Sequence, residues 1–237
     1  MTLNKGDFIE LNYSGRVDDS EKLLFDTTEE SVAKTEGIYD KKTKYGSVII
    51  PLGEGYLLPG LDNQLEGKDL GKFTFQIEAV DGFGKKDAKK LQLIPMKFFK
   101  NDGLRPQAGL QVNVDGDIGV VRSVSGGRVI VDFNHPLSSR DLVYDVEVLR
   151  IVNDPKEKLE SVLKVIGLPV SNIEATQEKA TITSTQEFPE QITIPLTEDI
   201  TRLTGIKEVV FETTKQSKAK ASLAVPAKPE QKEEKKE

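Results

Sequence analysis

A glycine-framed turn at residues 53–62, GEGYLLPGLD, has a spacing that could do chemistry. Two of its glycines stand in the G-x-x-x-x-G arrangement of a phosphate-binding loop. That loop needs a lysine and then a Ser or Thr directly after its second glycine, to meet phosphate and magnesium. Leu61 and Asp62 stand there instead. We therefore reject a nucleotide site. Leu57 and Leu58 indicate either a site for an apolar ligand or ordinary core residues.

Large side chains next to predicted turns or on inward strand faces form a second candidate set, and one carboxylate accompanies them. Asp26 follows Phe25 directly in LLFDTT. If the strands form one sheet with a short helix across it, these side chains can line an apolar cup with an acid at its rim. The alternative is an ordinary hydrophobic core. The set consists of Tyr13, Phe25, Leu57, Leu58, Leu61, Phe83 and Tyr144.

Several kinds of catalytic site are excluded by residue type. The chain has no cysteine and a single histidine, which rules out thiolate nucleophiles and histidine-rich metal sites. There is no G-x-S-x-G and no H-E-x-x-H motif. His135 lies in the turn sequence NHPL and is assigned no role, and Asp18 and Asp19 are interpreted as a solvated hairpin tip. We expect neither a metal nor a cofactor.

Composition and charge indicate a globular protein without a general attraction to nucleic acid or membrane. The 237 residues suffice for one large domain or two small ones, and the formal net charge is −6 with 30% charged residues. The opening MTLNKGDFIE contains no signal-peptide core, and no apolar run is long enough to span a bilayer. A cytoplasmic location is expected.

The elements that position the candidate residues are strands. Alternation of apolar and polar residues predicts half-buried antiparallel strands at residues 8–17, 48–52, 73–77 and 144–148. One short helix is predicted at LDNQLEG, where two leucines lie one turn apart and a glycine can end the helix.

Residues 86–134 have the pattern of a separate small β-rich module. Alternating runs at residues 110–114 and 129–133 predict strands, and the DGD and SGG sequences predict turns between strands. A module of about 50 residues has only a marginal core of its own.

A third unit is predicted for residues 153–214. Asp154 suits a helix N-cap, Pro155 the first helical position and Glu157 a capping box, and Gly167 can end the helix. Short strands are expected around TITST and QITIPL, a second helix near TEDITRLT and a last strand near KEVVFET, which gives a small α+β unit. Residues 215–237 contain almost no large apolar side chain and are predicted to be a disordered tail.

The order of these motifs resembles that of FKBP-type peptidyl-prolyl isomerases, most closely the SlyD-like branch with a domain inserted in the flap, in its long archaeal form. The resemblance covers roughly residues 5–152. It is carried by IELNYSGRV, LFDTT, VIIPLGEGYLLPGLDNQLEGKDLGKFTFQIEAVDGFG and VDFNHPLSSRDLVYDVEVLRI.

The resemblance implies an α+β fold, a bent antiparallel sheet around a short helix, formed by residues 1–85 and 135–152. Residues 86–134 would be the inserted domain and residues 153–214 an additional C-terminal one. By position, the residues that match the family's catalytic ones would be Tyr13, Phe25, Asp26, Leu58, Phe83 and Tyr144. Those that match its substrate-binding ones would be Val48, Leu57 and Leu61.

Two roles follow from the resemblance by position. The backbone N–H of Leu58 would bind a substrate carbonyl, while Asp26 would either hold Tyr13 or oppose the carbonyl carbon electrostatically. Three residues depart from the usual pattern: Phe83 replaces a tyrosine, Leu61 a tryptophan and Val48 an aromatic residue. A wider and less polar pocket is therefore expected.

The expected function is that of a proline isomerase with a tethered chaperone module, acting on unfolded or partly folded proteins and proline-containing peptides. The candidates for an apolar client groove are Ile94, Met96, Phe98, Phe99, Leu104 and Leu110. One alternative is a catalytically weak holdase that only binds peptides. An RNA-binding role for residues 86–134 ranks last, since their excess of basic residues is small and lacks an aromatic RNA-binding pattern.

Overall fold

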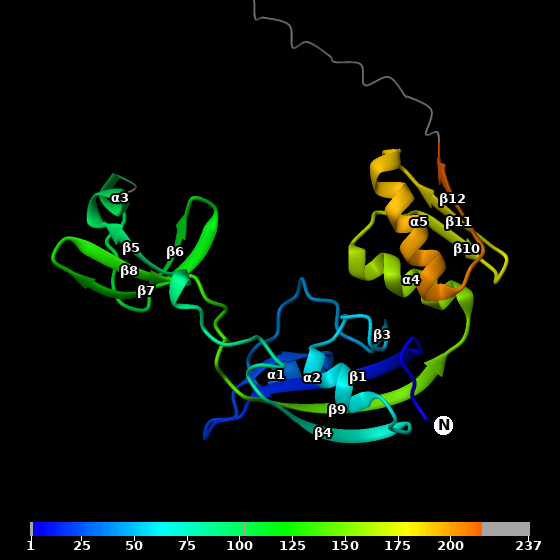
Figure 1. The fold of residues 1–237 in the computed structure, drawn as a ribbon, viewed down its shortest axis with the longest axis horizontal. Coiled ribbons are helices and arrows are strands. Elements are labelled where there is room, and N and C mark those ends of the chain that lie inside the picture. Colours follow the sequence, from blue (N-terminus) through cyan, green and yellow to red (C-terminus); the bar gives the residue numbers. More distant parts are fainter. Residues whose placement is uncertain (1, 102, 215–237) are drawn as a thin grey trace, which may run out of the picture.

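The computed structural model describes residues 2–101 and 103–214, and the predicted disordered tail lies outside these residues. The described chain is of mixed α+β type and builds three separate sheets. Figure 1 shows a U-shaped molecule in which the sheet of residues 8–77 and 142–152 forms the base. The other two sheets stand in lobes at opposite ends of this base.

The basal sheet is antiparallel and has β1 and β9 at its centre. Its path is β2-β1-β9-β4, and β3 pairs with the other part of β1. Two short helices accompany it, and α2 packs its leucines against the sheet. The elements are β1 (Phe8–Val17), β2 (Leu24–Thr27), α1 (Glu30–Thr35), β3 (Val48–Pro51), α2 (Pro59–Leu65), β4 (Gly71–Ile77) and β9 (Leu142–Val152).

The predicted alternation in these strands is confirmed by their burial. Ile9 and Leu11 of β1 are fully buried in the basal core, whereas Glu10 between them is partly exposed. The predicted short helix is also confirmed: Leu61 and Leu65 are buried on one face of α2, which ends before Gly67. The helix is thus fixed by its two leucines, one turn apart, packing into the core.

The left-hand lobe in Figure 1 is a four-stranded antiparallel sheet with the order β5-β8-β7-β6. Its core contains Ile94, Phe99, Val121, Val129 and Val131. The elements are the 3₁₀ turn η1 (Ala88–Lys90), β5 (Leu91–Pro95), α3 (Met96–Asn101), β6 (Gln111–Val114), β7 (Asp117–Ser125) and β8 (Arg128–Asp132).

The right-hand lobe packs two helices on a three-stranded sheet. The strands follow the order β10-β11-β12; β10 is antiparallel to β11, and β12 is parallel to it, as the crossover through α5 requires. The elements are α4 (Pro155–Ile166), β10 (Asn172–Ala175), β11 (Lys179–Ser184), α5 (Glu190–Thr204) and β12 (Glu208–Thr213).

The capping prediction for α4 is confirmed. The Asp154 carboxylate accepts a hydrogen bond from the Glu157 backbone N–H at 2.9 Å, Pro155 is the first helical residue, and Gly167 ends the helix in the left-handed conformation. The Glu157 carboxylate binds Arg150 of β9 at 2.8 Å. The first turn of α4 is thereby connected to the basal sheet.

The prediction of a strand at QITIPL was wrong, because these residues form the first turns of α5. The alternation of Ile192, Ile194 and Leu196 suggested a strand, but the two isoleucines are 48% and 56% exposed. Leu196 and Ile200, four residues apart, are buried instead and define a helical stripe. Packing of this stripe outweighs Pro195, which removes one helical hydrogen bond.

The right-hand lobe shares its core with the basal sheet. Phe8 of β1 and Val152 of β9 are buried among residues of α4, α5 and β11, and Ile49 of β3 packs against the same cluster. In Figure 1, β9 runs from the base of the left-hand lobe to that of the right-hand lobe. One strand thus links both lobes to the basal sheet.

Candidate active site

A cavity of about 330 Å³, called the cup below, lies on the basal sheet where most of the predicted cup residues meet. Strands β1, β2 and β9 contribute side chains to its wall, together with α2 and the loop that leads into it. The lining residues are Tyr13, Asp26, Gly55, Tyr56, Leu57, Leu58, Leu61, Phe83 and Tyr144. Seven of these nine are among the residues predicted from the sequence.

Tyr13 and Asp26 form the polar part of the cup. The Tyr13 hydroxyl donates a hydrogen bond to Asp26 Oδ2 at 2.9 Å. Burial, and then the charge and the hydrogen bond of Asp26, raise the pKa of Tyr13 well above its usual range. Tyr13 therefore remains a neutral donor at physiological pH, and it orients the carboxylate at the rim.

Aromatic rings form one wall through edge-on contacts. The ring of Phe25 meets those of Tyr144 and Phe83 nearly perpendicularly, at centroid distances of 5.8 and 6.1 Å. Tyr13 lies 6.0 Å from Tyr144. Phe25 thus supports two rings that line the cavity.

Gly15 of β1 makes this ring arrangement possible. A Cβ at this position would lie 2.8 Å from ring atoms of both Phe25 and Tyr144, closer than carbon atoms approach. Its backbone φ is not in the left-handed region, so the glycine is needed for space. The sequence gives no sign of this, since the strand pattern alone would accept alanine there.

The loop Gly53–Leu58 forms the opposite wall and is fixed by a buried carboxylate. Asp62 of α2 accepts a hydrogen bond from the Gly53 backbone N–H at 3.0 Å, and the N–H of Gly55 also interacts with it. Burial raises the pKa of Asp62, although these two hydrogen bonds oppose the shift. The aspartate that excludes phosphate from the turn thus holds the turn together.

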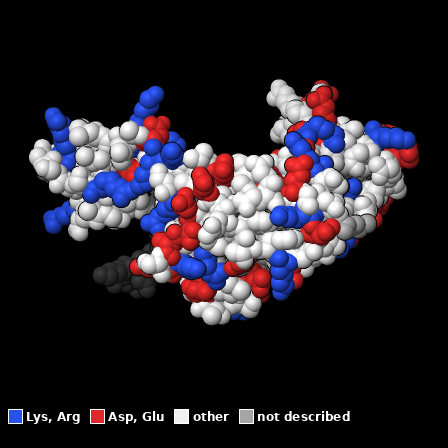
Figure 2. Space-filling view, turned by 60° about the horizontal axis from the view of Figure 1, so that its bottom comes forward, with Lys and Arg blue, Asp and Glu red and all other residues white. Residues whose placement is uncertain are grey.

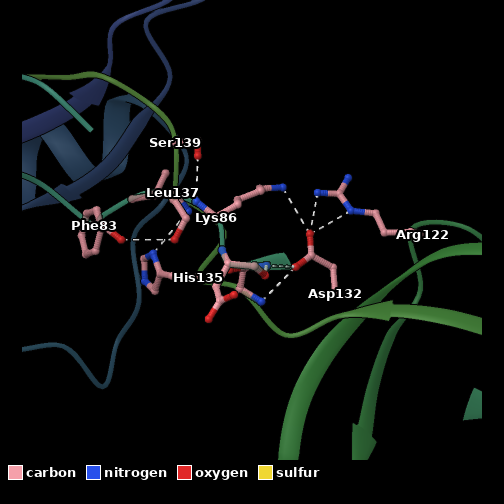
Figure 3. Close-up of polar contacts among 10 residues, drawn as sticks. Phe83, Lys86, Arg122, Asp132, His135, Leu137 and Ser139 are labelled. Atoms are coloured by element: carbon pink, nitrogen blue, oxygen red, sulfur yellow. Dashed lines mark hydrogen bonds and ion pairs between the residues drawn. The ribbon is translucent and has the colours of Figure 1, made fainter. Parts of the chain in front are cut away.

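Phe83 is connected to the segments that lead to the left-hand lobe. Its ring stacks on the imidazole of His135, at 4.2 Å between centroids and 11° between planes. Figure 3 shows both residues beside two chain segments that run next to each other. These segments are joined by hydrogen bonds from Ser138 Oγ to Phe83 O and from the Lys86 N–H to Ser139 Oγ.

Asp132 is the main anchor at the lobe end of these segments (Figure 3). Its carboxylate is buried and accepts hydrogen bonds from Arg122 at 2.8 and 3.0 Å, from Lys86 at 3.2 Å and from Asn134 at 2.8 and 2.9 Å. Burial alone would raise its pKa, but these donors outweigh burial and hold the pKa well below its usual range.

Not every predicted site residue lies in the cup. Val48 of β3 is absent from its lining and faces a different cavity, between β3 and α4. Phe25 supports the cup through ring contacts without lining the cavity itself. The sequence reasoning missed Tyr56, which lies beside Leu57 in the loop and could have been suggested by that position alone.

The six candidates for a client groove have different environments. Ile94 and Phe99 are buried in the core of the left-hand lobe, and Met96 and Phe98 pack against that core. Leu104 and Leu110 are 38% and 37% exposed. The outer face of the same sheet presents Leu93 and Ile130, which are paired across β5 and β8 and exposed.

Three further observations concern surface charge, metal-binding side chains and helix length. Figure 2 shows basic and acidic side chains interspersed over the visible face of the molecule. Among residues 2–101 and 103–214, no group of three or more metal-binding side chains could hold a metal ion. In the same part of the chain, no helix is long and apolar enough to cross a membrane.

Comparisons with known proteins agree with this geometry. Residues 92–137 match the model of the family described as "FKBP26, IF domain". The chain is 29% identical over 147 residues to the short-type peptidyl-prolyl cis-trans isomerase of Methanocaldococcus jannaschii, covering 62% of this chain and 92% of the relative.

Two bacterial proteins are also similar. The FKBP-type 16 kDa peptidyl-prolyl cis-trans isomerase of Escherichia coli (strain K12) is 36% identical over 109 residues, which cover 44% of this chain and 72% of the relative. The FKBP-type peptidyl-prolyl cis-trans isomerase SlyD of Yersinia pestis is 34% identical over 114 residues, which cover 46% of this chain and 57% of SlyD.

Proposed function

Since the chain belongs to the FKBP-type peptidyl-prolyl cis-trans isomerase family and is an isomerase of this type, we propose that it accelerates rotation of X–Pro bonds in unfolded or partly folded proteins. We further propose that the cavity of about 330 Å³ on the basal sheet is its active site. The single observation that carries this assignment is that the hydrogen-bonded Tyr13–Asp26 pair lines one cavity together with Leu57 and Leu58.

The reaction needs a fitting environment rather than a nucleophile. Rotation about an X–Pro bond crosses a barrier of roughly 18–20 kcal/mol, because amide resonance is lost at the top. Water that hydrogen-bonds to the amide oxygen favours the planar, charge-separated form. An apolar cup that excludes this water and fits the twisted amide lowers the barrier.

We assign a proposed role to both the apolar and the polar groups of the cup. The proline ring packs between Leu57, Leu61 and Tyr144, and the Leu58 N–H binds a substrate carbonyl. Leu58 is the N-cap of α2 and has an extended backbone. Its N–H therefore precedes the helix and is available to a ligand. Asp26 fixes Tyr13 through their hydrogen bond and brings its own negative charge to the rim.

We also propose that the chain consists of three domains with different functions. Residues 1–85 and 135–152 would be the isomerase domain, residues 86–134 an inserted chaperone domain, and residues 153–214 a C-terminal domain. The core of the insert is its own and supports its separation, whereas the core of the C-terminal unit also includes Phe8 and Val152 of the basal sheet. The proposed client surface of the insert comprises its exposed apolar side chains Leu93, Leu104, Leu110 and Ile130, because Ile94 and Phe99 are needed for its core.

The test is exchange NMR on a short peptide with an apolar residue before proline, with catalytic amounts of the full chain. We expect cis/trans exchange on a timescale far shorter than the uncatalysed tens to hundreds of seconds. A folded protein that binds the peptide without accelerating exchange would instead indicate the holdase alternative. Replacement of the usual tyrosine by Phe83, which removes one hydroxyl donor, is the observation that favours that alternative.

A further inference from the structure

The loop Gly53–Leu58 forms one wall of the cup, and its residues Tyr56, Leu57 and Leu58 pack against the basal core. A second cavity of about 280 Å³ lies on its other side, lined by Lys5, Leu52 and Asp62 among others. Gly55 borders both cavities. Gly53 and Gly55 both have φ +76°, a conformation that only glycine adopts without strain. Residues 53–55 make no such apolar contact with the core, so polar contacts contribute to holding this part of the loop.

One of those contacts comes from the C-terminal unit. Glu54, between the two glycines, forms an ion pair with Arg202 of α5, at 2.5 Å between Oε2 and Nη1. Arg202 is itself oriented by Asp199, one helical turn earlier, at 3.5 Å. The Glu54 side chain is only 22% exposed. The loop is thus held by Asp62 from within and by Arg202 from outside.

The neighbouring loop residue also interacts with α5. Burial and then the Asp199 charge raise the pKa of Tyr56, which lines the cup, and Arg202 opposes this shift. The helix that carries Arg202 is firmly attached to the basal sheet, because Phe8 and Val152 are buried in the same core as Leu196 and Ile200 of α5. Arg202 therefore has a fixed position relative to the cup.

We propose that Arg202 is a positioning residue of the isomerase: through Glu54 it holds the loop Gly53–Leu58 in the conformation that receives the substrate. The proposal rests on the proposed active site. It gives the C-terminal unit a part in positioning the site, since Arg202 holds from outside a wall that Asp62 holds from within.

The size of the effect follows from the kind of contact. An exposed ion pair shifts an equilibrium by up to about fivefold. If the loop without Arg202 is in the receptive conformation for a smaller fraction of the time, the apparent affinity falls by that fraction. Bound substrate restores the loop, so KM should rise while kcat stays nearly constant.

The experiment compares wild type, Arg202→Gln, Glu54→Gln and the double variant in peptide exchange at low ionic strength. Lys207→Gln is the matched control, because Lys207 forms an exposed ion pair with Glu178 at 2.8 Å within the C-terminal unit. We expect each of the two single variants to raise KM by about two- to fivefold. The double variant should show no further rise, and the control no change.

Two further readouts separate positioning from general stability. Added salt should raise the KM of wild type but leave that of Arg202→Gln nearly unchanged, because salt screens exposed ion pairs. Amide hydrogen exchange at residues 53–58 should become faster in Arg202→Gln, by about the same factor as KM rises.

The outcomes distinguish this inference from the proposed function. Unchanged KM and unchanged loop exchange in Arg202→Gln, with an active wild type, would overturn the role of Arg202. An inactive wild type would overturn the proposed function, and the loop exchange rates would then still decide whether Arg202 holds the loop. Equal changes in Lys207→Gln would show a general effect of surface charge and contradict positioning.

Discussion

The ring of Phe83 lies flat against the imidazole of His135, at 4.2 Å between centroids. Phe83 lines the cup, and His135 belongs to the segment that returns from the left-hand lobe. The only histidine of the chain, to which the sequence analysis gave no role, therefore supports a wall of the proposed active site.

The stacking predicts a specific requirement for an aromatic side chain at position 135. An aromatic pair contributes about 0.5–1.5 kcal/mol beyond its buried area. His135→Ala should therefore lower kcat/KM for a short peptide by about threefold, and His135→Phe should retain activity. Peptide exchange NMR measures both. An equal loss in the two variants would mean that the imidazole acts through its polarity.

The Tyr13–Asp26 hydrogen bond predicts how these two side chains depend on each other. Hydrogen bonds to charged groups contribute about 1.5–3 kcal/mol, so Asp26→Ala should lower kcat/KM by about tenfold or more. Tyr13→Phe keeps the ring and removes the donor. If Asp26 acts only by holding Tyr13, the double variant will be no worse than Asp26→Ala, whereas additive losses would show a direct electrostatic role. Unchanged rates in both single variants would contradict the assigned site.

The close approach of Phe25 and Tyr144 over Gly15 predicts that this position tolerates no side chain. In Gly15→Ala the new Cβ would meet both rings at 2.8 Å, which forces them apart and changes the cup. We expect a clear loss of kcat/KM and a lower melting temperature. Gly37→Ala separates backbone strain from crowding: nothing lies within 4 Å of its Cβ position, but its φ is +76°. It should lower the melting temperature and leave kcat/KM unchanged. Full activity of Gly15→Ala would show that the wall is not rigid.

The position of the insert predicts that isomerisation of short peptides can be separated from the proposed chaperone activity. All lining residues of the cup lie outside residues 86–134. A short turn from Lys85 to His135 is feasible because Ser139 N donates to Gly84 O at 2.8 Å, which holds the two segments together. The deletion should preserve isomerisation of a four-residue peptide, and it should greatly slow catalysis of proline-limited refolding by lowering the effective client concentration. A parallel fall of both rates would mean that the insert is part of the catalytic fold.

The buried Asp132 predicts a pH-dependent stability of the insert. Its pKa is depressed in the folded state, so its contribution is present above the unfolded value of about 3.9 and is lost as the pH falls below that value. Asp132→Asn should destabilise the insert by about 3 kcal/mol at pH 7, and by progressively less as the pH falls further below about 4. Calorimetric unfolding at several pH values measures this, with exposed Asp117→Asn as the control. A pH-independent difference would contradict the charge-based account.

The local patterns of the sequence sufficed for most secondary structure and for much of the site. Alternation placed β1 and β9, and the caps of α4 are formed by side chains within three residues of each other, so they are determined locally. Positions at predicted turns and on inward strand faces made Tyr13, Asp26, Leu57 and Leu58 candidates for a cup. The resemblance in motif order then favoured a cup over an ordinary core. The strand prediction at QITIPL was wrong because Ile192 and Ile194 are exposed, so their alternation does not reflect burial, and tertiary packing of Leu196 and Ile200 favours a helix.

Only the tertiary structure decided the contacts between residues far apart in the chain. Glu54 and Arg202 are 148 residues apart, and nothing in either local sequence indicates the other. A side chain at Gly15 would meet two rings from other strands, and Val48 lines a cavity between β3 and α4 and not the cup. Such relationships depend on how the three units pack together, and that arrangement follows from burial over the whole chain rather than from any segment of it.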